Sequence, residues 1–183
     1  MRVTLLDYGM GNLRSVTRAL EAAGADVSRQ EIVGDGPLVL PGVGAFGRAA
    51  ENLRGQRWEA LREHVKQGRP LLGICLGMQL CFESSEEHGQ HQGFGFFTGQ
   101  VRHLGVGITV PNMGWHRLAG LGDPWAYFAH SYGVRQSPHA IAHIEHGGSV
   151  VAAARRDNVL GFQFHPEKSG AAGVALIKEW LRC

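Results

Sequence analysis

The sequence predicts an α/β fold, with a mostly parallel, doubly wound central sheet, helices on both faces and a smaller antiparallel extension. Short apolar runs at residues 3–6, 38–40 and 70–74 have the length and composition of buried strands. Stretches with apolar residues at helical spacing lie between these runs, an alternation typical of parallel sheets. The middle of the chain is instead rich in glycine, valine and aromatic residues, which favours antiparallel strands.

The first half of the chain supplies the parallel part of this sheet. Asn12 is a candidate N-cap for a first helix, which Gly24 ends. Gly55 separates two further helical stretches that follow the strand at Leu38–Leu40. The apolar residues at helical spacing fall within residues 13–23, 46–53, 58–65 and 78–82.

The second half supplies the antiparallel extension and the last helix. Antiparallel strands are expected within residues 93–110 and 125–144, and a further buried strand at residues 159–164. Ser169 is the candidate N-cap of the final helix. Since no linker or internal repeat divides the chain, residues 1–183 are expected to form one domain.

Composition excludes several classes of function. The formal net charge is +2 and the basic residues form no block, which argues against nucleic acid or an anionic membrane as the partner. No apolar run approaches the roughly 18 residues that a membrane span needs. The start of the chain lacks the features of a signal peptide, so a soluble, cytoplasmic protein is expected. The three cysteines do not suggest a disulfide framework and leave room for one reactive thiol.

The most distinctive local pattern is Gly73-Ile74-Cys75-Leu76-Gly77, which lies after a strand and before a helix. It has the spacing of a nucleophile elbow with sulfur in place of a hydroxyl. Larger residues at the two glycine positions would clash in so tight a turn, and the following helix N-terminus favours a thiolate. The alternative is a core cysteine between turn glycines. That interpretation suits Cys81, while Cys183 is expected to be a free terminal thiol.

A cysteine that attacks an amide needs a base, and His165 has the right context. It ends a buried strand, and Pro166 restrains it to extended geometry, in which residues two apart point the same way. Glu167 can then accept one ring N–H and leave the other nitrogen for Cys75, as in a catalytic triad. The alternative is a strand-end histidine with an acidic neighbour by chance.

Backbone amides near this elbow are candidate donors to a developing oxyanion. The turn Pro41-Gly42-Val43-Gly44 follows the strand at Leu38–Leu40, and the N–H of Leu76 follows the nucleophile. A doubly wound sheet would bring the turn and the elbow to the same edge. Taken alone, the turn favours the simpler interpretation, a plain turn that opens a helix.

Several motifs, taken in order, carry a resemblance to a known family. PGVGAF (41–46), GICLGMQL (73–80) and GFQFHPEKS (161–169) resemble the class I, or triad, glutamine amidotransferases. More specific segments resemble the glutaminase subunits of imidazole glycerol phosphate synthases, which act in histidine biosynthesis. These segments are DYGMGNLRSV (7–16), VPNMGW (110–115) and YFAHSY (127–132).

The resemblance implies a flavodoxin-like fold, a Cys75 thioester, and ammonia transfer to a (βα)₈-barrel cyclase subunit in a heterodimer. It implies no cofactor and no metal. By position in the motifs, Gly44 and Leu76 would contact the oxyanion. Gln79 and the Ser131-Tyr132 backbone would hold the glutamine head group. Asn12, Trp115, Tyr127 and Lys168 would lie at the cyclase interface or its gate.

The chain departs from that family at Asn112 and His116, where members often have histidine and then asparagine. Two other functions remain as alternatives: the glutaminase subunit of another synthase, such as one for anthranilate or pyridoxal phosphate, and a catalytically silent regulatory subunit. Two weaker patterns carry no function. The histidines at 139, 143 and 146 share no face of the strand expected there, and Glu86-Glu87-His88 is expected to be a solvated loop.

Overall fold

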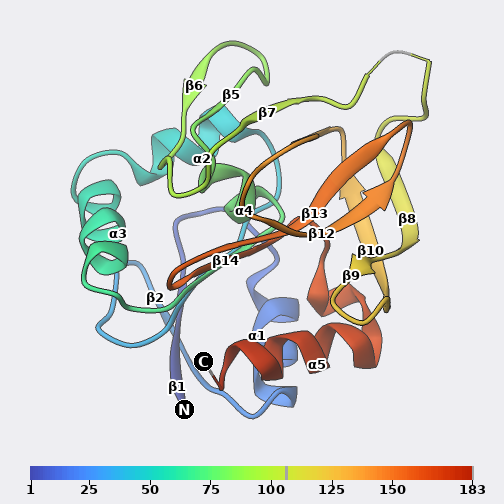
Figure 1. Ribbon diagram of the computed structural model, residues 1–183. Helices are drawn as coiled ribbons and strands as arrows, with labels where there is room; N and C mark the ends of the chain where they lie inside the picture. Colours follow the sequence, from blue (N-terminus) through green and yellow to red (C-terminus); the bar gives the residue numbers. More distant parts are fainter. Residues whose placement is uncertain (106, 183) are drawn as a thin grey trace.

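The computed structural model describes residues 1–105 and 107–182, so the expected free thiol at Cys183 lies outside the described residues. In the described part, the largest sheet has eight strands in the order β2-β1-β3-β4-β14-β13-β12-β9 (Figure 1). The first five of these strands run parallel to one another, and β13, β12 and β9 continue the sheet in antiparallel pairing. The eight strands are β1 (Arg2–Leu6), β2 (Asp26–Gln30), β3 (Leu38–Leu40), β4 (Leu71–Ile74), β9 (Ala119–Gly120), β12 (Ala140–Glu145), β13 (Ser149–Arg156) and β14 (Val159–Phe162).

The order of the parallel strands is that of a flavodoxin-like, doubly wound sheet, because the chain moves outward from β1 to β2 and then returns past β1 to β3 and β4. In such a sheet, the crevice forms outside the carboxyl ends of the strands. The predicted fold class is therefore confirmed. The prediction of one domain over residues 1–183 stays a prediction.

Helices cover both faces of the sheet because successive strand residues point to opposite sides. Val39 and Leu72 pack with α1 (Leu13–Ala22) and α5 (Gly170–Trp180), whereas Leu38 and Leu71 pack with the helices on the other face. That second group consists of α2 (Phe46–Leu53), α3 (Gln56–Lys66) and α4 (Leu76–Leu80). Figure 1 shows α1 and α5 side by side, and the two helices are in contact.

Two small sheets form the extension. β8 (Asn112–Arg117) and β10 (Trp125–His130) pair as an antiparallel hairpin. The other sheet has the order β11-β7-β5-β6, from β11 (Tyr132–Gly133), β7 (Gln100–His103), β5 (Ser84–Ser85) and β6 (His91–Gln92). The antiparallel extension is confirmed, although β5 and β7 pair in parallel.

Three local expectations were wrong in detail. The strand expected at residues 159–164 ends at Phe162, and the helix expected from Met78 begins at Leu76, directly after Cys75. Ser169 precedes α5 but does not cap it with its side chain. Its hydroxyl donates to the carbonyl of His165 at 2.7 Å and accepts from the amide of Tyr127 at 3.0 Å. The side chain therefore joins the short helix η1 (Pro166–Lys168) to β10.

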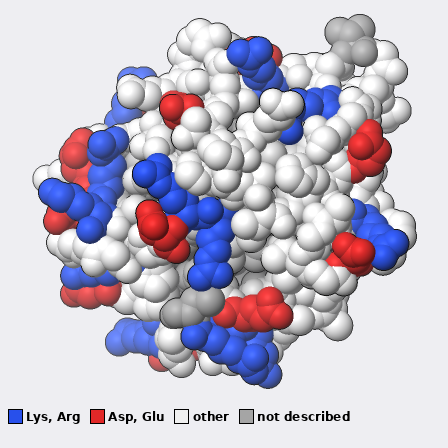
Figure 2. Space-filling view, in the orientation of Figure 1, with Lys and Arg blue, Asp and Glu red and all other residues white. Residues whose placement is uncertain are grey.

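The surface carries charges of both signs. On the face seen in Figure 2, Lys and Arg side chains lie among Asp and Glu side chains, in keeping with the small net charge of +2. Among the described residues, no helix is long and apolar enough to cross a membrane.

Candidate active site

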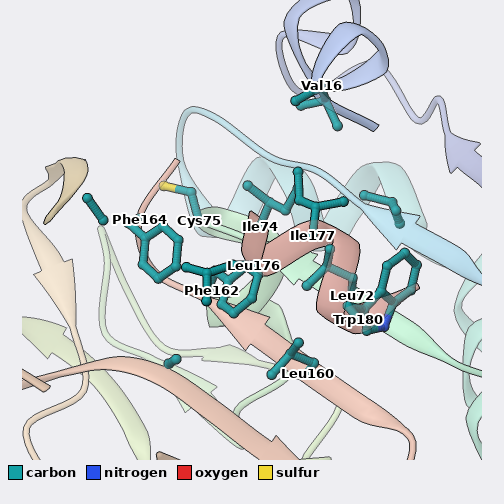
Figure 3. Packing of buried hydrophobic residues seen from close by; sticks show 14 of the residues in the cluster. Val16, Leu72, Ile74, Cys75, Leu160, Phe162, Phe164, Leu176, Ile177 and Trp180 are labelled. Atoms are coloured by element: carbon teal, nitrogen blue, oxygen red, sulfur yellow. The ribbon is translucent and has the colours of Figure 1, made fainter. Parts of the chain in front are cut away.

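Cys75 occupies a strained turn between β4 and α4. Its φ is +53°, a left-handed conformation that a residue with a side chain adopts only when its surroundings hold it there. The amide of Cys75 donates to the carbonyl of Phe162 at 2.7 Å, which fastens the turn to the neighbouring strand β14. Figure 3 shows Cys75 among the buried side chains of one core cluster, between Phe164 and Ile74.

The two glycines of the elbow allow the helix to approach the sheet. A Cβ atom on Gly77 would lie 1.9 Å from the carbonyl oxygen of Leu40, on the adjacent strand β3. A Cβ atom on Gly73 would lie 2.8 Å from backbone atoms of Gly77. Any side chain at these positions would displace backbone, so the clash expected from the sequence is confirmed.

His165 and Glu167 stand together at the end of the adjacent strand. The Nδ1 of His165 donates to Oε1 of Glu167 at 2.8 Å, and the ring also hydrogen-bonds the Cys75 side chain. Both His165 and Glu167 side chains are almost fully buried. Since Nδ1 faces Glu167, Nε2 remains for the sulfur, which is the order of contacts in a nucleophile, base and orienter set.

The surroundings of His165 favour its charged form. Burial by itself lowers the pKa of the ring, but the hydrogen bonds to Cys75 and Glu167 and the negative charge of both groups outweigh it and raise the pKa to about 10. An imidazolium beside the sulfur is what stabilises a thiolate, the nucleophilic form of cysteine. By contrast, Cys81 is buried in the core and burial raises the pKa of its thiol, so it stays protonated. The core role expected for Cys81 is confirmed.

A cavity of about 540 Å³ opens beside Cys75 and His165. Gly44 and Leu76, the two residues expected at the oxyanion, line it. So do Gln79, Ser131 and Tyr132, the three expected at the substrate. The sequence therefore identifies residues that the fold brings to one cavity from the turn between β3 and α2, from α4 and from the start of β11 with the residue before it.

Gln79 is held by hydrogen bonds inside the cavity wall. Its Nε2 donates to the carbonyl of Tyr132 at 2.8 Å and to Oε1 of Gln163 at 3.1 Å. Gln163 in turn directs its Nε2 to the sulfur of Cys75 at 3.7 Å. The sequence does not identify Gln163 as a site residue, because it lies within an apolar run. The one local signal for it is an amide side chain among residues of the core.

The turn at Pro41–Gly44 packs closely on the elbow. A Cβ atom on Gly42 would lie 2.7 Å from the Cβ of Leu76, and Gly44 has a φ of +102°, which favours glycine. The buried hydroxyl of Tyr8 donates to the carbonyl of Pro41 at 2.6 Å. Tyr8 therefore fixes the Pro41 end of this turn through a hydrogen bond.

Three of the four residues expected at a partner interface gather near the cavity. Trp115 and Tyr127 are paired across the β8–β10 hairpin, with ring centroids 6.0 Å apart. Nζ of Lys168 lies 5.7 Å from the centroid of the Tyr127 ring. Asn12 is engaged separately, as the predicted N-cap of α1, with its side-chain oxygen accepting from the amide of Ser15 at 3.3 Å.

Glu87 was wrongly expected to lie in a solvated loop. It is half-buried, lines the cavity, and accepts a hydrogen bond from the amide of Phe46 at the start of α2, at 2.8 Å. Such a contact across 41 positions depends on tertiary structure, so no local pattern predicts it. The acidic pair Glu86-Glu87 is the only hint in the sequence.

Comparisons with known proteins agree with this geometry. The model of the family "Glutamine amidotransferase class-I" matches residues 4–182. The imidazole glycerol phosphate synthase subunit HisH of Aquifex aeolicus (strain VF5) is 44% identical, and the alignment covers 100% of this chain and 97% of that protein. HisH of Halobacterium salinarum (strain ATCC 700922 / JCM 11081 / NRC-1) is also 44% identical, over 98% of this chain and 92% of its own length.

Solved structures show the same fold at lower identity. A crystal structure of a glutamine amidotransferase superposes with a TM-score of 0.80 at 20% identity and covers 99% of both chains. A chain of PurLQS from Thermotoga maritima gives a TM-score of 0.77 at 19% identity, over 99% of this chain and 97% of its own. Since the family model spans nearly the whole sequence and the relatives match it end to end, the chain belongs to the class-I glutamine amidotransferase family.

Proposed function

We propose that the chain is the glutaminase subunit of an imidazole glycerol phosphate synthase, in which Cys75, His165 and Glu167 release ammonia from glutamine. The observation that carries the proposal is the contact series from the Cys75 side chain to His165 and from His165 to Glu167, beside a cavity large enough for an amino acid. The full-length relatives of this chain are subunits of that synthase, which supports the choice of reaction.

The first half of the reaction forms a thioester. The Cys75 thiolate attacks the side-chain amide carbon of glutamine, and the C=O π electrons move to the oxygen as an oxyanion. Backbone amides at Gly44 and Leu76 are placed to stabilise this charge. The oxyanion then collapses, the C–N bond breaks, and His165 gives its proton to the departing nitrogen, which leaves as ammonia.

The second half regenerates the thiolate. His165, now neutral, takes a proton from water while the oxygen attacks the thioester carbon, and collapse of this second intermediate expels the Cys75 thiolate and leaves glutamate. Glu167 holds the ring in the orientation that both halves need.

The cavity has groups that match the rest of the substrate. Gln79, Ser131 and Tyr132 form the wall that would hold the head group, and the Glu87 carboxylate has the sign to attract an α-ammonium group. Ammonia would pass to a (βα)₈-barrel cyclase subunit that docks over Asn12, Trp115, Tyr127 and Lys168. A reactive thiol of this kind persists in a reducing compartment, so we assign the reaction to the cytoplasm.

The proposal is tested by a single substitution in the complex. Cys75→Ala should reduce glutamate release from glutamine to background, because Cys75 is the only thiol that lines the cavity among the described residues. Synthesis of imidazole glycerol phosphate from free ammonium should persist, since the cyclase supplies that chemistry. Glutamate release and product formation are measured separately in the purified chain mixed with the cyclase.

Cys81→Ala is the matched control, because Cys81 is buried in the core, does not line the cavity, and directs its thiol to the carbonyl of Gly77. It should keep glutamine hydrolysis close to the unmodified level. Glutamine hydrolysis by the Cys75→Ala chain would contradict the proposal that Cys75 is the nucleophile. Loss of the ammonium-dependent reaction as well would show that the two activities are divided differently between the subunits.

A further inference from the structure

A line of hydrogen bonds runs from the β8–β10 hairpin into the cavity wall. His116 Nε2 lies 2.7 Å from Oδ1 of Asn112, and Nδ2 of Asn112 lies 3.0 Å from Nε2 of His130. The other ring nitrogen of His130, Nδ1, lies 2.8 Å from the carbonyl oxygen of Tyr132. Three side chains from β8 and β10 therefore lead to one backbone atom of β11.

The end of this line fixes the direction of every bond in it. A carbonyl oxygen only accepts, so Nδ1 of His130 carries the proton, and the Nε2 of a neutral ring must accept from the Asn112 amide. The Oδ1 of Asn112 then faces Nε2 of His116, which must donate. Rotating the Asn112 amide would oppose two acceptors at its His130 end, where the tautomer is fixed, so the bond to His130 determines the orientation of the amide.

Burial makes this arrangement stringent. Asn112 is 2% exposed and His130 is 6% exposed, so an unpaired polar atom on either would have no water to replace its partner. Burial also lowers the pKa of His130 to about 4, which keeps the ring neutral near pH 7, as the bond from Asn112 requires. Burial and the charge of His146 likewise lower the pKa of His116.

The line continues past Tyr132 to the nucleophile. The same carbonyl accepts from Nε2 of Gln79 at 2.8 Å, and Gln79 is joined to Gln163, whose amide lies 3.7 Å from the sulfur of Cys75. Gln79, Tyr132 and Cys75 all line the cavity, whereas Asn112 and His116 do not. The two residues of β8 can therefore affect the site only through the groups they hold.

We propose that Asn112, His116 and His130 are positioning residues for the glutamine site, which hold the Tyr132 carbonyl and, through it, Gln79 in the geometry that binds the substrate. This rests on the proposed function and gives Asn112 and His116 a role at a cavity that they do not line. A correctly positioned cavity wall contributes equally to the binding of substrate and of transition state. Loss of that positioning therefore raises KM more than it lowers kcat.

The test measures glutamine hydrolysis by the complex after Asn112→Leu, which keeps the branching and the number of non-hydrogen atoms of the side chain and removes both hydrogen bonds. We expect KM for glutamine to rise about tenfold or more, with kcat within about twofold. The matched control is His64→Leu, because His64 is a buried histidine between the carbonyls of Gly34 and Pro70, away from the cavity. It should lower the melting temperature and leave KM unchanged.

Exchange of the two residues provides the rescue. His116→Asn pairs two amides, and Asn112→His pairs two rings, so each should raise KM. The double variant restores one ring and one amide between positions 112 and 116, and a neutral ring at 112 can both donate to His130 and accept from the new amide, so KM should return to within about threefold of the unmodified chain. Because His116 is half-buried, its variant remains available if Asn112→Leu fails to fold.

Two results would overturn the inference: an unchanged KM in the single variants, or a KM in the double variant no better than in the worse single one. A fall in kcat without a change in KM would also do so, because it would assign these residues to the chemical step. The Cys75→Ala chain is assayed in parallel. If that chain is inactive while KM stays constant in the others, the proposed function stands and only the positioning role fails.

Discussion

At the scale of single residues, Glu167 illustrates how the site is tuned. One carboxylate oxygen accepts from His165, while the other is buried and has no hydrogen-bond partner among the described residues. A buried carboxylate with a single partner directs its charge at that partner. This is one reason that the pKa of His165 is raised to about 10 despite the opposing effect of burial.

Tyr8 allows a residue-scale prediction about the oxyanion turn. Tyr8→Phe removes the only polar atom of the side chain and leaves the Pro41 carbonyl without the bond now seen at 2.6 Å. Because the turn would lose its orientation toward the developing charge, we expect kcat for glutamine hydrolysis to fall by about tenfold to a hundredfold, with little change in KM. Steady-state kinetics of glutamate release measure both.

The same substitution should lower the free energy of unfolding by about 1–3 kcal/mol, since a buried carbonyl would be left unsatisfied. Urea denaturation gives this value. An unchanged kcat in a measurably destabilised protein would limit Tyr8 to a structural role and exclude any part in catalysis.

At the scale of elements, the contact between α4 and β3 determines how far Cys75, directly before α4, lies from the sheet. Gly77→Ala would place a methyl group 1.9 Å from the Leu40 carbonyl and must separate the helix from the strand. We expect a loss of about 1–3 kcal/mol or more in the free energy of unfolding, together with loss of glutaminase activity. Chemical denaturation and a glutaminase assay measure the two effects.

Gly36→Ala is the matched control for that prediction. A Cβ atom on Gly36 would meet its nearest neighbour, the carbonyl of Arg2, at an ordinary 3.4 Å, and neither Gly36 nor Gly77 has a positive φ. The two substitutions therefore differ in clearance, and neither places alanine in a left-handed conformation. Similar stabilities for both variants would show that α4 can move away from β3 at little cost.

At the scale of the whole molecule, two buried histidines predict how stability depends on pH. The pKa of His165 is raised to about 10 in the folded state, so its contribution is fully present below about pH 6.5 and is lost as the pH rises toward 10. The pKa of His130 is lowered to about 4, so stability falls as the pH drops from about 6.5 toward 4 and the folded state resists protonation.

The free energy of unfolding should therefore be greatest near pH 6.5 and decline on both sides, which urea titrations between pH 4 and pH 10 would reveal. His165→Asn should flatten the alkaline decline and leave the acid one in place. If the alkaline decline is equally steep in that variant, the ionic contact of His165 with its neighbours is not its source.

Much of this molecule follows from local patterns. Apolar runs separated by helical spacing predict the parallel strands β1, β3, β4 and β14, but not β2, whose sequence is mostly polar. The pattern around Cys75 predicts a turn whose glycines prove necessary on steric grounds. Such features are readable because each depends on residues close in the sequence. His165 and Glu167 are two positions apart, and extended backbone alone makes them neighbours.

What the sequence did not predict depends on distant partners. Glu87 reaches the amide of Phe46, and Gln79 reaches Tyr132 and Gln163, across 41, 53 and 84 positions. Ser169 has the composition of a helix cap, yet its hydroxyl binds η1 and β10 instead. Polar side chains of this kind choose partners that only the assembled fold provides.

The bond between the Cys75 amide and Phe162 has a consequence for how such a protein can diversify. The register of β4 against β14, with Ile74 opposite Phe162, sets the spacing of the reacting groups. The chain segment between these two strands is long, and the strand pairing holds its two ends side by side. Insertions, deletions and new binding faces can accumulate within that segment while the sulfur and the imidazole keep their separation. One hydrolytic apparatus could thus be inherited intact by lineages that serve quite different synthases.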